Sequence, residues 1–205
     1  MKPLRAPLLA CALLAAAHCP ALSAEIAGTV LAIKGDCVAD PDKQAVPLKV
    51  GDSVTVGETI LTAAGAKLKL QMADGSVIAA GAGSRITIQS YGKDPAGKRD
   101  VSLNLASGLL RAVVAPAEQP SKFEVSTATG VAAVRSTDWF VESLDDSTRV
   151  GVLHGVVSLA SKATSRQVDI PTGWGARVIG DHDPVKPRLW EEKEFQDVTA
   201  RTDIQ

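Results

Sequence analysis

FEVSTATGVAAVRSTDWFVE at residues 123–142, followed by TRVGVLHGVVSLA at residues 148–160, is the stretch that decides the predicted fold. Apolar and polar residues alternate from Phe123 onward, which is typical of strands with one buried face. Residues 131–134 are all apolar and predict a strand that is buried on both faces. Glycines and the polar residues 145–147 supply the turns between strands. The stretch therefore predicts about five short strands.

The same residues resemble the periplasmic domain of the FecR family. In that family a threonine-rich strand leads to an Arg-Gly-Thr turn and then to an apolar strand. Here the turn is Arg135-Ser136-Thr137, with serine in place of the usual glycine. Residues 50–77, VGDSVTVGETILTAAGAKLKLQMADGSV, are similar to the family's run of Gly-Asp, Thr and Asp-Gly-Ser. The resemblance covers residues 26–180 and implies a β-helix-like domain.

The first 24 residues have the features of a secretory signal peptide. Lys2 and Arg5 precede an apolar stretch at residues 8–17, which small residues follow up to Ala24. This apolar stretch is too short to span a bilayer. We therefore expect cleavage near Ala24 and a periplasmic location. No later stretch reaches the ~18 apolar residues of a membrane helix, so the sequence predicts no integral membrane segment.

The chain that remains after this cleavage is close to electrical neutrality. Loss of Lys2 and Arg5 leaves 20 of the 22 basic residues against 23 acidic ones, a net charge of −3. Nucleic acids and anionic membranes bind proteins through a concentrated positive surface, so the sequence predicts neither as a partner. Cys11 and Cys19 leave with the signal peptide, so Cys37 is interpreted as a small structural side chain without a disulfide.

Residues 25–180 are predicted to form one all-β domain, because short strands are separated by glycine turns about every 8 to 12 positions. The alternation over residues 66–72 predicts one buried and one exposed face, and Asp74-Gly75 predicts a tight turn. Only seven aromatic residues occur, and six of them lie at or after Phe123. The resulting thin core of small aliphatic side chains favours a β-solenoid or β-helix-like roll over the alternative, a β-sandwich.

Two segments are predicted to lie outside the regular pattern. The charged residues 91–100 contain Pro95 and two glycines and are expected to form the clearest surface loop. Residues 181–205 are predicted to form a short C-terminal tail, helical or irregular. A helical turn or two is expected over residues 188–195 after Pro187, and the last residues are expected to be loose.

The sequence contains no recognisable pattern of catalytic or cofactor-binding residues. It has no Gly-x-Ser-x-Gly elbow, phosphate-binding loop or His-Glu-x-x-His motif, so we predict neither an enzyme nor a bound cofactor. His154, at a strand end, is interpreted as a partly buried or turn histidine. The adjacent residues Asp181-His182-Asp183 would point to opposite sides of an extended chain, which argues against a metal site.

Tryptophan is scarce in this chain, and its three positions are the candidate partner-binding residues: Trp139, Trp174 and Trp190. Exposed tryptophan side chains are frequent anchors of protein interfaces. The alternative is that these rings fill the ends of the core. Because Phe140 follows Trp139 directly, we expect one of these two rings to point inward and the other outward.

Three functions are compatible with these residues. The first is a non-catalytic exported module that binds a protein partner in the envelope, as the FecR resemblance implies. Regulatory members of that family are membrane-spanning sensors with a cytoplasmic anti-sigma segment, which relay a signal from a TonB-dependent receptor. This sequence is expected to be a soluble member without either segment. The second function is a structural domain bound to cell-wall glycan, the peptidoglycan, and the third is a periplasmic hydrolase.

Overall fold

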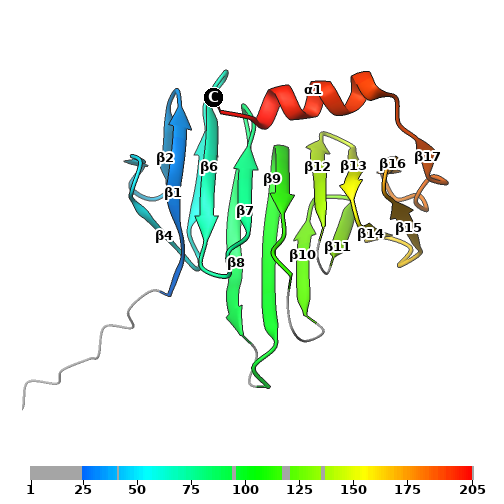
Figure 1. Cartoon of the computed structure of the whole chain (residues 1–205), viewed down its shortest axis with the longest axis horizontal. Coiled ribbons are helices and arrows are strands. Elements are labelled where there is room, and N and C mark those ends of the chain that lie inside the picture. Colours follow the sequence, from blue (N-terminus) through cyan, green and yellow to red (C-terminus); the bar gives the residue numbers. More distant parts are fainter. Residues whose placement is uncertain (1–24, 41, 94–95, 117–120, 135–136, 205) are drawn as a thin grey trace, which may run out of the picture.

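The computed structural model describes residues 25–40, 42–93, 96–116, 121–134 and 137–204; the predicted signal peptide and Ser136 lie outside these residues. Within them the chain forms seventeen strands and one helix (Figure 1). Their bounds are β1 (Ile26–Lys34), β2 (Cys37–Ala39), β3 (Val46–Pro47), β4 (Ser53–Thr55), β5 (Thr59–Thr62), β6 (Lys67–Met72), β7 (Val77–Ala80), β8 (Arg85–Lys93), β9 (Arg99–Val113), β10 (Lys122–Ser126), β11 (Gly130–Val134), β12 (Asp138–Leu144), β13 (Ser147–His154), β14 (Val156–Ser161), β15 (Gln167–Pro171), β16 (Trp174–Ile179), β17 (Arg188–Leu189) and α1 (Glu192–Thr202).

The strands belong to one large mixed, open sheet that is folded into two layers. Layer A has the strand order β4-β1-β6-β7-β9-β12-β13-β16-β17. Layer B has the order β3-β2-β5-β8-β9-β10-β11-β14-β15. Among the described ladders, only the one between β9 and β10 is parallel. The chain passes repeatedly between the layers, and buried side chains from both form one core.

Strand β9 joins the two layers because it runs through both. Residues 99–107 pair with β8 in layer B, and from Gly108 onward the strand pairs with β12 in layer A. Gly108 has a φ of +90°, a conformation that glycine adopts at far lower cost than other residues. A Cβ atom at this position would lie 2.5 Å from Ser84 Cα. The corner of the sheet therefore requires glycine.

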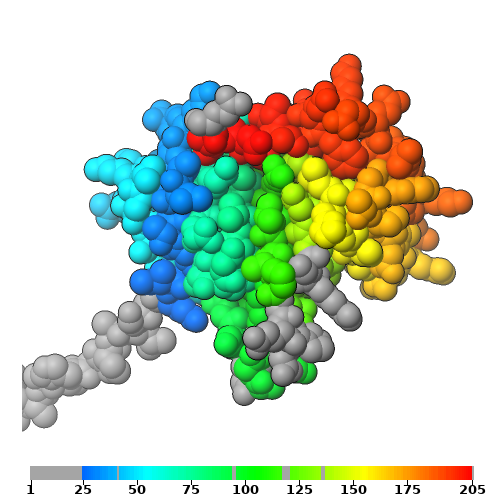
Figure 2. Space-filling view, viewed as in Figure 1, coloured from blue at the N-terminus to red at the C-terminus, as the bar shows by residue number. Residues whose placement is uncertain are grey.

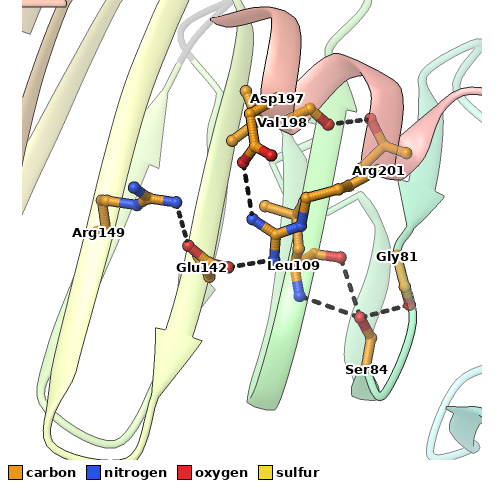
Figure 3. A network of polar contacts seen from close by, with 9 residues as sticks. Gly81, Ser84, Leu109, Glu142, Arg149, Asp197, Val198 and Arg201 are labelled. Carbon is orange, nitrogen blue, oxygen red and sulfur yellow. Dashed lines mark hydrogen bonds and ion pairs between the residues drawn. The ribbon is translucent and has the colours of Figure 1, made fainter. Parts of the chain in front are cut away.

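A buried serine ties the same corner together (Figure 3). The Ser84 hydroxyl oxygen lies 2.8 Å from the Gly81 carbonyl oxygen and accepts a hydrogen bond from the Leu109 backbone N–H at 3.0 Å. Ser84 is fully buried, so these contacts replace the water that its hydroxyl loses on folding.

The core between the layers agrees with the predicted alternation. Residues 66–72 alternate as expected, with every second side chain buried. The predicted turn at Asp74-Gly75 is also confirmed, since it joins β6 to β7 with a φ of +86° at Gly75. Phe123 and Trp139 are among the largest fully buried side chains. These two rings and Tyr91 of the first half are the aromatic side chains of a core that is otherwise mostly aliphatic.

The mostly-β prediction is confirmed, but some of its details are not. Strand β11 buries only one face, because Val131 and Ala133 are partly exposed between buried neighbours. Residues 91–93 and 99–100 of the stretch expected to be a loop instead extend β8 and β9, which remain paired as far as Lys93 and Arg99. The β-solenoid is not confirmed. Most neighbouring strands are joined as antiparallel pairs, whereas the coils of a β-helix stack in parallel.

The tail contains a longer and later helix than predicted. Arg188 and Leu189 do not begin the helix, because they pair with β16 as strand β17. Helix α1 starts after Glu191, which forms a reciprocal capping box with Glu194, and it continues to Thr202 where loose residues were expected. In Figures 1 and 2 this C-terminal segment lies across the upper part of the strands. The helix contacts β9 and β6 of layer A.

A partly buried polar network closes the opposite end of the core. Asp74 accepts hydrogen bonds from Tyr91 Oη at 2.5 Å and from Arg99 Nη1 at 3.1 Å, and its other contacts include the Ser76 N–H at 2.9 Å. Partial burial raises the pKa of the Asp74 carboxyl, but the hydrogen bonds from Tyr91, Ser76 and Arg99 outweigh it and hold this pKa below its usual value. Ionised Asp74 therefore stabilises the fold.

Replacement of Asp74 by asparagine is expected to lower the free energy of unfolding by about 3 kcal/mol at pH 7, because it leaves the buried Arg99 cation without this counter-charge. A carboxyl whose pKa is depressed by folding stabilises the protein above its unfolded pKa of about 3.9. That contribution disappears as the pH falls through the lower, folded pKa. The difference between wild type and Asp74→Asn should therefore shrink below about pH 4 in urea-unfolding experiments.

The matched control is Asp42→Asn, which breaks a pair with Arg85 in which the aspartate is 73% exposed. Such a surface pair contributes about 0–1 kcal/mol, so this variant should unfold like wild type at every pH. A gap between Asp74→Asn and wild type that stays constant from pH 7 to pH 3 would contradict the role of the ionised carboxylate.

Candidate interaction surface at the β16–β17 edge

Trp190 lies on the outer face of layer A, between the end of β17 and the start of α1. It is 7% exposed and packs against two glycines of neighbouring strands. A Cβ atom at Gly151 or Gly175 would approach the indole ring to 2.9 Å or less, so only glycine leaves room for the ring. Phe195 of α1 contacts the ring with a centroid distance of 5.1 Å. Trp190 therefore fixes the start of the helix to the sheet.

Charged groups hold the other end of α1 to layer A (Figure 3). Glu142 on β12 is only 5% exposed and accepts hydrogen bonds from two arginines. One is Arg201 of the helix, which also pairs with Asp197 at 3.2 Å, and the other is Arg149 on β13, at 2.5 Å. Lys67 on β6 donates to the Ala200 carbonyl oxygen at 2.5 Å. The helix is therefore held by both apolar and ionic contacts.

The three candidate tryptophans lie in different environments. Trp139 is fully buried in the core, and Trp190 is buried beneath α1. Burial favours the core-filling alternative for these two rings, because neither offers a free face to a partner. Trp174, at the start of β16, is 37% exposed. Phe140 is buried as well; it points outward from the core as expected, but Leu109 and Trp190 cover it.

Trp174 forms an exposed apolar pair with Leu189. The two residues lie opposite each other on β16 and β17, and Leu189 is 64% exposed. Successive strand residues point to opposite sides, so this pair lies on the other side of the β16–β17 ribbon from Gly175 and Trp190. It stands at the edge of layer A. This arrangement offers an aromatic and an aliphatic group together to another molecule.

A basic pocket, which the sequence analysis missed, lies on the Trp190 side of the same ribbon. Its charged lining residues are Arg149, Arg177, Lys186, Arg188 and Glu194, and its volume is about 280 Å³. Arg188 donates two hydrogen bonds to Glu194, at 2.6 and 2.9 Å, which lowers the pKa of the Glu194 carboxyl. Positions 177–188 hold three basic and two acidic residues, so the local sequence gives no clear signal of the pocket.

The remaining candidates of the sequence show no assembled chemistry. His154 and His182 are exposed and lie on separate elements. Burial, together with the charge of Asp36, raises the pKa of the Cys37 thiol to about 11, so this cysteine is protonated and unreactive at neutral pH. In the described part of the chain, no three His, Cys, Asp or Glu side chains gather as metal ligands would. The helix present there is also too short and too polar to cross a bilayer.

Comparisons with known proteins give a family from a sequence model and a fold from solved structures. A family model described as FecR protein matches residues 58–158. Two crystal structures of candidate anti-sigma factors from Parabacteroides distasonis ATCC 8503 are similar to the chain, with TM-scores of 0.56 and 0.55 and identities of 15% and 17%. Each match covers 67% of this chain and 62% of the other, so the chain spans less than two thirds of those structures. Among curated proteins, no match was found.

Proposed function

The chain carries a FecR domain over residues 58–158, and from this premise we propose that it is a non-catalytic binding or regulatory module that acts on a protein partner in the bacterial envelope. The signal-peptide features of residues 1–24 support export to the periplasm as part of the same proposal. The two solved structures of the same fold are described as candidate anti-sigma factors. Such factors act on another protein, which favours a protein as the partner class here.

The observation that carries this proposal is the exposed pair of Trp174 and Leu189. Large apolar side chains are usually buried, but Trp174 and Leu189 are 37% and 64% exposed at the edge of the sheet. Tryptophan is one of the residue types enriched among the anchors of protein interfaces. The pair lies outside residues 58–158, the part that matches the family model, so the family match by itself assigns it no role.

Replacement of Trp174 by alanine is expected to weaken partner binding about thirtyfold, equivalent to a loss of ~2 kcal/mol for one anchor residue. The bait would be residues 25–205, immobilised and exposed to envelope extract. A protein that wild type captures would then be titrated against each purified variant. The melting temperature of Trp174→Ala should stay within a few degrees of wild type, because the ring is already partly in water.

The matched control is Leu31→Ala, which removes another exposed apolar side chain, 49% exposed, on β1 near the opposite end of layer A. It should bind like wild type. Equal affinities for wild type and Trp174→Ala would overturn the role of this surface. Sedimentation of the wild-type domain with purified sacculi, lost on Trp174→Ala, would instead indicate peptidoglycan, because an exposed indole also stacks on sugar rings.

A further inference from the structure

Four cationic side chains converge in the pocket beside Trp190, although they come from separate parts of the chain. Arg149 lies on β13, Arg177 on β16, Arg188 on β17, and Lys186 on the segment that precedes it. The pocket lining contains one acidic residue, Glu194 of α1. The pocket therefore carries an excess of positive charge in a protein whose overall charge is slightly negative.

This charge excess is incompletely neutralised by the protein itself. Arg149 and Arg177 are directly opposite each other on neighbouring antiparallel strands, an arrangement in which like charges destabilise a sheet. Arg149 is compensated by Glu142 at 2.5 Å, and Arg188 by its two bonds to Glu194. Within the described residues, neither Arg177 nor Lys186 forms an ion pair. Two cations thus remain available to an added negative group.

Arg149 also has a donor without an acceptor. Its Nε atom is buried, and no hydrogen-bond partner for it exists among the residues that the structure describes. A buried N–H in this condition costs free energy, so the side chain keeps this position only because its other contacts hold it there. The guanidinium is held in place by Glu142 and by the Trp190 ring, whose centroid lies 5.5 Å from Arg149 Cζ. The guanidinium group beside the pocket is therefore preorganised.

We propose that this pocket is a binding site for an oxyanion, a phosphate or carboxylate group. Guanidinium groups bind both through paired N–H donors. The volume of about 280 Å³ is slightly below the range of sites that enclose whole small molecules, roughly 300–1,000 Å³, so it suits one charged group rather than a large ligand. The oxyanion is either a free anion or an acidic side chain of a partner, and only the second source rests on the proposed function.

The test for a free anion is a titration of the folded chain, residues 25–205, with inorganic phosphate at constant ionic strength. NMR would follow the arginine Nε–Hε signals, and the Arg149 signal should shift in a saturable manner. Arg177→Gln and Lys186→Gln should each raise the dissociation constant at least tenfold while the spectrum stays folded, since both side chains are exposed. Lys43→Gln, an exposed lysine between β2 and β3, is the matched control and should titrate like wild type.

A second titration with acetyl-Asp-Leu-amide separates the two sources. Phosphate binding without peptide binding identifies a free anion, and tighter binding of the peptide identifies an acidic side chain of a partner. No saturable shift with either probe, or shifts equal in wild type, Arg177→Gln and Lys186→Gln, would overturn the proposal. Trp174→Ala should leave the phosphate titration unchanged, because that ring lies on the other side of the ribbon. Failure of the Trp174 surface and failure of the pocket are therefore distinguishable.

Discussion

Replacement of Gly108 by alanine is expected to destabilise the domain by about 4 kcal/mol, through two effects that act at the same atom. A non-glycine residue at a φ of +90° costs about 1–3 kcal/mol of backbone strain. The added Cβ would also lie 2.5 Å from Ser84 Cα and 2.8 Å from Ser84 Cβ, and forced overpacking of this kind typically costs about 1–3 kcal/mol. Ser84 cannot move away freely, because its hydroxyl group is hydrogen-bonded to both Gly81 and Leu109.

Denaturant unfolding of Gly108→Ala and Gly65→Ala would separate these two effects. Gly65 has a φ of +75°, but a Cβ there would meet no atom within 4 Å. The Gly65→Ala variant therefore measures the backbone strain alone, and its loss of stability should stay at about 1 kcal/mol. Equal losses in the two variants would mean that the contact with Ser84 does not contribute, and that β9 can bend between the layers in another way.

Replacement of Trp190 by alanine is expected to cost about 4 kcal/mol, which is typical of a truncated buried aromatic side chain. The ring fills the space over Gly151 and Gly175. Because glycine has no side chain, neither residue can fill the cavity that the substitution leaves. The ring also contacts Phe195 in the first turns of α1. Loss of the ring should therefore release the start of the helix as well as destabilise the sheet.

Two measurements would check this expectation. Urea unfolding should give the loss of stability, and amide hydrogen exchange should become faster in α1 than in the central strands. Trp174→Ala provides the control, because a ring that is already 37% exposed should cost much less. A Trp190→Ala variant with wild-type stability and a protected helix would show that the ionic contacts of Arg201 and Lys67 hold α1 without the indole.

These two predictions also bear on function. If Trp190 is a structural anchor, Trp174 is the only candidate tryptophan with a free surface in the described residues, and partner binding can be tested on it without disturbing the core. The basic pocket depends on Trp190 as well, because the indole forms part of its wall and holds Arg149. We therefore expect Trp190→Ala to impair phosphate binding indirectly, whereas Arg177→Gln should impair it with the fold intact.

The sequence by itself determined the class of fold and the local turns. Period-2 alternation over residues 66–72 depends only on which side chains avoid water, so it predicted the buried face of β6 correctly. Asp74-Gly75 predicted its turn because glycine adopts the required positive φ. The motifs around residues 50–77 and 123–142 predicted the FecR family, which the family model over residues 58–158 supports.

Only the tertiary structure decided which distant residues meet. The sequence placed the start of the helix too early, because Arg188 and Leu189 pair with β16 as strand β17. No local pattern in the tail indicates this pairing. Burial of Trp190 follows from two glycines that are 24 positions apart in sequence and adjacent only through the register of β13 and β16. The same register places Arg149 opposite Arg177 and so creates the basic pocket. Strand register depends on the whole sheet, because each pairing must bury the apolar faces of both strands. The sequence of one strand therefore does not determine it.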